Sequence, residues 1–304
     1  MNFTLLGNII KTELALPFKI EEGYFLDKAN NEEIDKIKKT FSKQLTEYFN
    51  LPGFNPFENT RKNNSIINLE KESLNYWVLR HDLPNTVSYD TDIFNLLLPD
   101  SIYPIATIFT EDGLSGFSWT GNTRNILRQL STSFEVSKLE NSSIEMFKNI
   151  KEKRQKLDKE KHKFILSSIN DFYRLTDIPN HHDLRIIGYF SIIEKLISSR
   201  KAIQINSINF QLQNKFYLIN NRSKHKIDLL TETNPTDKTT FHKVIELLYK
   251  YRSSIAHGST PDFNDELQIL KASHVADKII ERMCKITIVA ALEEPDLIID
   301  LREC

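Results

Sequence analysis

The chain has 304 residues, of which 40% are hydrophobic and 27% charged, which is typical of a soluble globular protein and long enough for two domains. Its formal net charge of -1 argues against a nucleic-acid binder with a uniformly basic surface and leaves room for a locally basic cleft. The two cysteines, Cys284 and Cys304, match no metal or redox spacing, and the N-terminal residues lack the pattern of a signal peptide. Because the apolar runs are too short to span a bilayer, we expect a cytoplasmic protein with no membrane partner.

Residues 1–138 alternate short β-like runs with turns and are predicted to form an α+β domain. The expected elements are a hairpin over Phe18–Leu26, a helix over Asn31–Asn50, strands at Ser65–Leu69, Tyr76–Arg80, Tyr103–Thr110 and within Gly113–Asn122, and a helix from Asn122 or Thr123 to Leu130. Trp77 and Trp119 are expected in a core or an interface rather than stacked on bases. The role of this domain stays open between sensing, RNA selection and docking to a partner.

Residues 139–304 carry a helical period almost throughout and are predicted to form an all-α bundle. The expected helices are one or a pair over Ser143–Leu175, one from near Pro179 to about Ser199, a segment over Phe210–Ile219, one capped by Thr239 or Thr240 that ends near His257, and one over about Asn264–Leu292 that Pro295 stops. The charged run Lys151–Lys163 interleaves acidic with basic residues, which favours a solvated helix face over a nucleic-acid contact.

Common phosphate-binding and metal-binding motifs are absent from the sequence. The 8 Gly form no phosphate-binding loop, and there is no HExxH and no paired CxxC. The triplet His181-His182-Asp183 lies where a helix is expected to start, so a polar helix start is favoured over a metal site. His242 and Glu246 are four residues apart, so a helix-stabilising contact between them is favoured over a metal site. We therefore expect neither a metal nor a cofactor.

The stretch YKYRSSIAHGST, Tyr249–Thr260, contains the remaining candidate site. On a regular helix Arg252 lies roughly 60° from the centre of the apolar stripe and His257 roughly 160° from it. Ser253 lies one turn before His257 on the same face, and Gly258 suits the left-handed position that ends a helix. Spacing alone is also compatible with a plain helix end. There a cationic histidine interacts favourably with the helix dipole, and an arginine packs its aliphatic stem against apolar surface while its head stays in solvent.

An arginine and a histidine in this arrangement supply the groups needed for metal-free cleavage of RNA. A guanidinium grips two phosphate oxygens and stabilises charge as it builds up, and a histidine moves protons near neutral pH. Cleavage through the 2′-hydroxyl needs three groups: a base, an acid and a cation. One chain offers only two of them, the cation Arg252 and a single imidazole, His257. If the His257 faces of two copies met, one cleft would hold both pairs, and a two-fold dimer is the commonest arrangement.

The residues ELLYKYRSSIAHG, Glu246–Gly258, resemble the Arg-x4–6-His signature of HEPN domains, and most of all the Apea-like branch, in which a tyrosine-rich helix ends in Arg-Ser and His-Gly. The residues DLRIIGYFSIIEKLIS, Asp183–Ser198, resemble the earlier core helix of that branch, including an acidic residue at Glu194. The resemblance covers roughly the C-terminal half of the chain. Many HEPN nucleases have Asn, Asp or His directly after the arginine, where this chain has Ser253.

The resemblance implies a metal-independent endoribonuclease that acts as a homodimer through its HEPN bundle, in toxin–antitoxin or antiviral defence systems. Arg252 and His257 take the two signature positions as catalytic residues, and Ser253 and Tyr249 are candidates for supporting or substrate-binding roles. The implied partners are an RNA substrate, a second copy and an antitoxin or defence-system protein. Some HEPN proteins are binding modules, so a non-catalytic module that assembles with a partner effector stays open. A metal-dependent DNA nuclease is a weaker third hypothesis, because the sequence lacks a carboxylate and histidine cluster.

Overall fold

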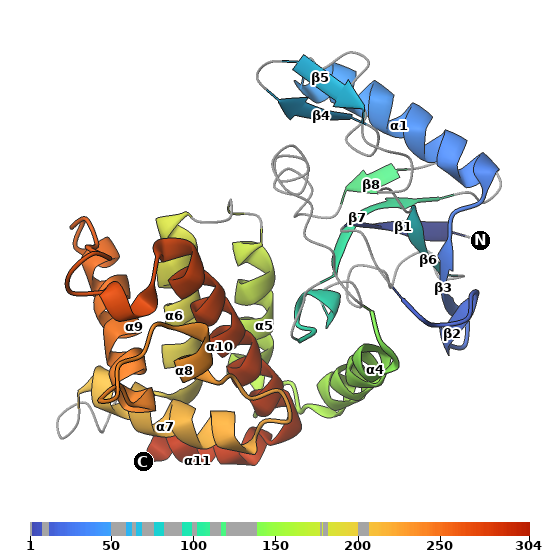
Figure 1. Ribbon diagram of the computed structural model, residues 1–304. Helices are drawn as coiled ribbons and strands as arrows, with labels where there is room; N and C mark the ends of the chain where they lie inside the picture. The colour runs from blue at the N-terminus through green and yellow to red at the C-terminus, as the bar shows by residue number, and fades with distance from the viewer. Residues whose placement is uncertain are drawn as a thin grey trace. The chain divides into compact units, whose positions relative to one another are not determined.

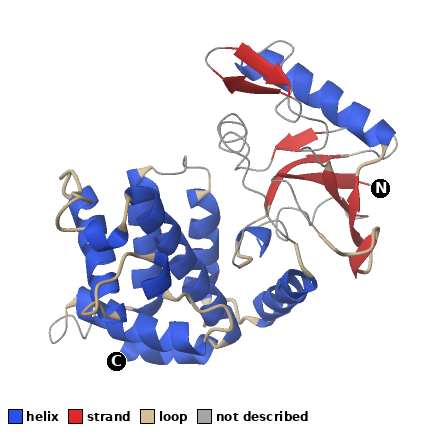
Figure 2. Ribbon diagram, in the orientation of Figure 1, coloured by secondary structure: helices blue, strands red, loops and turns tan. Residues whose placement is uncertain are grey.

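The structure is a computed structural model that describes residues 2–7, 12–49, 59–62, 65–68, 76–81, 93–98, 102–109, 117–119, 139–176, 178, 182–199 and 207–304. The chain divides into two compact units, Met1–Asn149 and Ile150–Cys304, called unit 1 and unit 2 below (Figure 1). The division lies within helix α4 (Asn141–Lys156), whereas Lys138, the expected end of the first domain, lies outside the described residues. Figure 2 shows that the strands belong to unit 1 and that unit 2 is helical, so the chain is α+β.

Unit 1 is built on an antiparallel sheet. Its strands are β1 (Asn2–Gly7), β2 (Phe18–Glu21), β3 (Tyr24–Lys28), β4 (Asn59–Lys62), β5 (Ser65–Asn68), β6 (Trp77–His81), β7 (Tyr103–Ile108) and β8 (Phe117–Trp119). The order in the main sheet is β2-β3-β6-β1-β7-β8, and β4 pairs with β5 separately. The predicted hairpin is β2 and β3, joined by a turn in which Gly23 has a φ of 70°. The predicted helix is α1 (Asn31–Phe49), and the helix expected up to Leu130 lies outside the described residues.

The central strand β1 was not predicted from the sequence. It pairs with β6 on one side and β7 on the other, and Phe3, Leu5 and Leu6 are buried. Thr4 is buried too, with its Oγ1 2.8 Å from Thr107 Oγ1 and 3.1 Å from His81 Nε2. Residues 2–5 alternate polar and apolar side chains, but Leu6 ends the alternation, so the run is too short to indicate a strand by itself.

Aromatic residues join the start of α4 to the rest of unit 1. Phe147 stacks on Phe94 with ring centroids 4.4 Å apart and lies 6.3 Å from the ring of Tyr24. Trp77 is only 3% exposed, so its ring is part of this unit's core and does not present a face to bases. For Trp119 the structure describes the backbone alone, in the pairing of β7 with β8.

Unit 2 consists of helices packed around α6 and α10. Its elements are α5 (Lys163–Leu175), α6 (Asp183–Ile197), α7 (Ile208–Arg222), α8 (Leu229–Glu232), α9 (Phe241–Ala256), the 3-10 helix η3 (Gln268–Leu270), α10 (Ser273–Glu293) and α11 (Pro295–Glu303). Helix α6 packs against α5, α9 and α10. Gly188 allows the close approach of α6 to α5, because a Cβ there would clash with the side chain of Leu175. The charged run Lys151–Lys163 covers the end of α4, a turn and the first residue of α5.

For the C-terminal region, one expectation was wrong and one was confirmed. The last long helix begins at Ser273 and not near Asn264, because Lys271 has a φ of 65° and Ala272 is extended, so the helical path is broken between η3 and α10. The stop at Pro295 is confirmed, because α10 ends at Glu293. The helix that follows, α11, was not predicted; Pro295 lies at its first position, where the missing N–H costs nothing and the fixed φ suits a helix.

Candidate active site

Helix α9 carries Arg252 and His257 and ends in a well-defined cap. Thr240 caps its start by accepting a hydrogen bond from Lys243 N through its side chain. At its end His257 is the C-cap and Gly258 has a φ of 71°. Gly258 N donates to the carbonyl of Ile255 at 3.0 Å, and Ser259 N donates to that of Ser254 at 2.9 Å. These two bonds form a Schellman motif, which fixes where the helix stops and where His257 lies.

The guanidinium of Arg252 lies between α9 and α6. Its side chain is 23% exposed, and Nη2 is 3.6 Å from Glu194 Oε1, which makes an ion pair that is too long for a hydrogen bond. Arg252 Nε is buried and has no hydrogen-bond partner among the described residues. The guanidinium carbon also lies 5.7 Å from the ring centroid of Tyr249, which in turn meets Phe190 edge-on at 6.1 Å. Arg252 is therefore positioned by its neighbours, and its side chain remains partly exposed.

Glu194 is the acidic neighbour of this arginine. Burial raises the pKa of its carboxyl above the ordinary value, and the charge of Arg252 lowers it in part. Glu194 Oε1 is buried without a hydrogen-bond partner among the described residues. The pair consequently holds two poorly satisfied polar groups side by side, an arrangement that a water, which both donates and accepts, would improve. Spacing did not reveal this pair, because the two residues lie far apart in the sequence. Only the resemblance drew attention to Glu194.

His257 is exposed to solvent at the helix end. Its backbone N donates to the carbonyl of Ser253 at 3.0 Å, and the side chain of Ser253 is half-buried one turn earlier. Five residues of helix separate the directions of Arg252 and His257 by about 140° around the axis. The structure thus brings Arg252, Tyr249 and Glu194 together within one chain and places His257 on a different side of α9.

A buried hydrogen bond anchors the last turns of α9 to α10. Tyr251 Oη donates to Asp277 Oδ1 at 2.9 Å, and the ring of Phe263 meets Tyr251 edge-on at 5.3 Å. Burial and the adjacent Asp277 carboxylate raise the pKa of the Tyr251 hydroxyl, so it remains a donor. Asp277 was missed at the level of sequence, because no spacing rule links it to a tyrosine on another helix.

The other residues considered from the sequence have structural partners. His182 is the N-cap of α6, where its Nδ1 accepts from Leu184 N at 3.1 Å, and His181 lies outside the described residues. His242 and Glu246 do not pair, contrary to expectation. The ring of His242 packs against Tyr217 at 5.2 Å, and Glu246 pairs with Lys243 at 2.7 Å. Within the described ranges no cluster of three or more potential metal ligands occurs. In the same part of the chain, no helix is long and apolar enough to cross a membrane.

Comparison with known proteins returned no family model, no curated protein and no solved structure that matches this chain. The similarity of Glu246–Gly258 and Asp183–Ser198 to HEPN domains therefore stands on those residues alone. Any function assigned through it is a proposal.

Proposed function

We propose that the protein is a metal-independent endoribonuclease of HEPN type that acts as a homodimer in a toxin or antiphage-defence role in the cytoplasm. The observation that carries the proposal is the end of α9, where a Schellman motif presents an exposed His257 five residues after a half-buried Arg252 whose Nε lacks a partner in the described chain. A partly exposed guanidinium and a solvent-accessible imidazole on one short segment are the groups that phosphodiester cleavage requires.

In the proposed reaction the 2′-hydroxyl of RNA attacks the adjacent phosphorus while the bond from phosphorus to the 5′-oxygen breaks. A His257 imidazole takes the proton of the 2′-hydroxyl, and a second imidazolium gives a proton to the leaving 5′-oxygen. Arg252 binds the phosphate and stabilises the extra charge of the five-coordinate transition state. Tyr249 orients the guanidinium through its ring face, and Ser253, on the His257 side of α9, contacts the imidazole or the RNA backbone.

The angle between the two side chains supports a site shared by two chains. Arg252 and His257 of one chain diverge by about 140° around α9, so one phosphate does not readily reach both in the same chain. A two-fold axis near His257 would bring the imidazole of one copy toward the guanidinium of the other and provide two imidazoles. The proposed partners are accordingly a second copy, an RNA substrate and an antitoxin or defence-system protein that restrains the activity.

Incubation of the purified chain with single-stranded RNA in EDTA tests the proposal. We expect cleavage by the wild type that leaves 2′,3′-cyclic phosphate and 5′-hydroxyl ends, and a loss of at least about 100-fold in His257→Ala and in Arg252→Ala. His274→Ala and Arg222→Ala are matched controls, because both side chains are exposed in unit 2 and neither is assigned to the site. Unchanged circular dichroism shows that each variant is folded. Activity that survives both site substitutions, or that EDTA abolishes, contradicts the proposal.

One observation favours a second candidate function. The guanidinium of Arg252 already faces Glu194 within its own chain, as expected for an arginine that holds α9 on α6. A non-catalytic HEPN module that assembles with a partner effector would use it in this way. This candidate predicts no RNA cleavage by the wild type and a stable complex with another protein in co-purification.

A further inference from the structure

We propose that Lys250 is a further substrate-binding residue, which holds the RNA phosphate next to the one that is cleaved, and that Glu266 competes with the RNA for this lysine. The proposal rests on the proposed ribonuclease function and deepens it. Its basis is the place of Lys250 on α9, its distance from His257 and the weakness of its ion pair with Glu266.

Lys250 lies on the same side of α9 as His257. Seven positions separate the two residues, which is about 20° short of two full turns and about 10.5 Å along the helix axis. Both side chains are exposed. Arg252 lies about 140° around the axis from His257, so it does not belong to this side. An RNA strand that reaches His257 and continues along this side of α9 therefore meets Lys250 as its first cation.

Small side chains lie between Lys250 and His257 on this side of α9. They are those of Ser253 and Ser254, both half-buried. Ser254 Oγ donates to the carbonyl of Lys250 at 3.1 Å, so this hydroxyl lies against the helix. The sugar–phosphate chain of an RNA can consequently lie close to α9 over this distance, where the long, flexible stem of the lysine lets its ammonium group reach a phosphate.

Glu266 binds the ammonium group of Lys250 in the free protein. Lys250 Nζ donates to Glu266 Oε1, and the two side chains are 46% and 53% exposed. An ion pair as exposed as this one contributes little to stability, because water screens both charges. A phosphate carries a full negative charge and several acceptor oxygens, so it can take the place of the carboxylate. Binding of RNA therefore exchanges one weak anionic partner of Lys250 for another anion.

The turn that carries Glu266 does not need this ion pair to stay on α9. Leu267 is 1% exposed, and the ring of Phe263 meets Tyr251 edge-on at 5.3 Å. Within the turn, Leu267 N donates to the carbonyl of Asp262 at 2.9 Å. Residues 258–267 contain three acidic side chains and no basic one, so the turn repels a polyanion. Glu266 therefore acts against RNA binding, and its removal should strengthen that binding.

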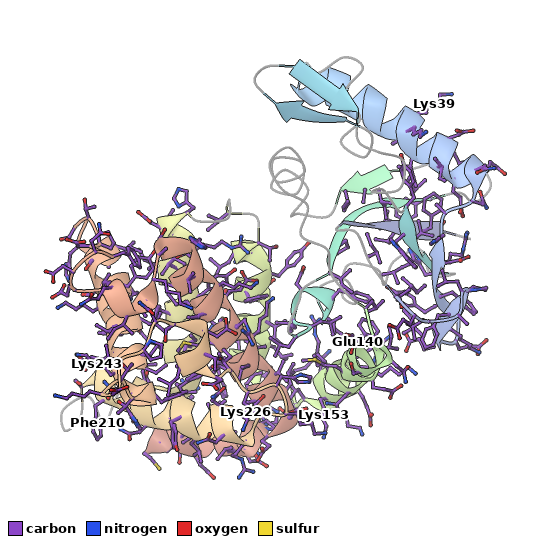
Figure 3. The ribbon with its side chains drawn as sticks, viewed as in Figure 1. Lys39, Glu140, Lys153, Phe210, Lys226 and Lys243 are labelled. Carbon is purple, nitrogen blue, oxygen red and sulfur yellow. The ribbon has the colours of Figure 1, made fainter. Side chains whose placement is uncertain are left out.

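Lys243 provides a matched control, because it resembles Lys250 and lies farther from His257. It is on the same side of α9, in the first turn of the helix (Figure 3). Its side chain is 45% exposed, and its Nζ is 2.7 Å from the carboxylate of Glu246, whose side chain is 44% exposed. Its distance from His257 along the axis is about 21 Å, twice that of Lys250. A short RNA bound at His257 does not reach it.

Cleavage of an RNA trinucleotide with hydroxyl ends, in EDTA, tests the proposal, because its two phosphates are the one cleaved and one neighbour. We expect Lys250→Ala to raise KM about fivefold with kcat unchanged and to reduce the salt dependence of kcat/KM, whereas Lys243→Ala changes neither. Lys250→Arg keeps the charge and should restore KM. Glu266→Gln should lower KM by about twofold, and only while Lys250 is present.

A dinucleotide separates the phosphate contact from a structural role of the lysine. It has only the phosphate that is cleaved, so Lys250→Ala should leave its KM unchanged. Equal KM values of Lys250→Ala and Lys243→Ala on the trinucleotide overturn the proposal and leave the ribonuclease standing. An equal rise in KM on the dinucleotide and the trinucleotide does the same.

If the wild type does not cleave RNA, the ribonuclease fails and a binding measurement tests Lys250 by itself. Fluorescence anisotropy with a 2′-O-methyl trinucleotide, which lacks the attacking hydroxyl, compares the same variants. Weaker binding by Lys250→Ala than by Lys243→Ala supports the phosphate contact, and equal or absent binding overturns it. Loss of self-association by Lys250→Ala in sedimentation velocity also overturns it, because the lysine then holds two copies together.

Discussion

At the scale of single residues, the pKa of Glu194 gives a test of its surroundings. Burial raises this pKa, and a carboxyl with a higher pKa in the folded chain stabilises the fold when it is protonated. This stabilisation is fully present when the pH is below the pKa of Glu194 in the unfolded chain. It is lost as the pH rises through the pKa of Glu194 in the folded chain. The Glu194→Gln variant stays neutral, so its free energy of unfolding relative to wild type should increase from about pH 4 to pH 7, by about 1.4 kcal/mol per pKa unit. Urea unfolding at both values measures this difference.

An exposed glutamate provides a control of opposite sign. A hydrogen bond and the charge of Lys156 lower the pKa of Glu152, so its contribution to stability is present above the unfolded pKa and is lost as pH falls through the folded pKa. Glu152→Gln should therefore lose stability relative to wild type between the same two pH values. If the free energy of unfolding of Glu194→Gln relative to wild type stays constant or decreases between the two pH values, burial is not the main influence on the pKa of Glu194.

At the scale of elements, the end of α9 depends on one glycine. Gly258 has a φ of 71°, and a Cβ there would meet no atom within 4 Å, so a substitution costs backbone strain alone. We expect Gly258→Ala to lower the free energy of unfolding by about 1 kcal/mol. Gly258→Asn should cost less, because asparagine tolerates the left-handed region. Chemical denaturation distinguishes the three proteins, and an alanine variant as stable as wild type would mean that the helix end rearranges.

The elements also show which features a sequence reveals. Helices such as α1 and α9 were predicted, because one face is apolar and the bounding residues favour caps. Strand β1 was missed because its alternation of polar and apolar residues covers only four positions, and α11 because a proline both stops one helix and starts another. At the site, the last turns of α9 were found from spacing. The neighbours Glu194 and Asp277 come from other helices, and only tertiary packing brings them there.

At the scale of the whole molecule, we propose a two-fold contact between copies of unit 2 at the end of α9. In the proposed site this contact brings the imidazole of one copy to the guanidinium of the other. Its catalytic consequence is measurable without knowledge of the natural RNA.

The most direct test is complementation between two inactive variants in EDTA. Arg252→Ala and His257→Ala are each expected to be inactive alone. Their equimolar mixture forms heterodimers in which one chain supplies Arg252 and the other His257. We predict cleavage by the mixture above the sum of the two variants, and below wild type because water must replace the missing imidazole as acid or base. A mixture as inactive as its components, beside an active wild type, would contradict the shared site, and an inactive wild type would contradict the ribonuclease itself.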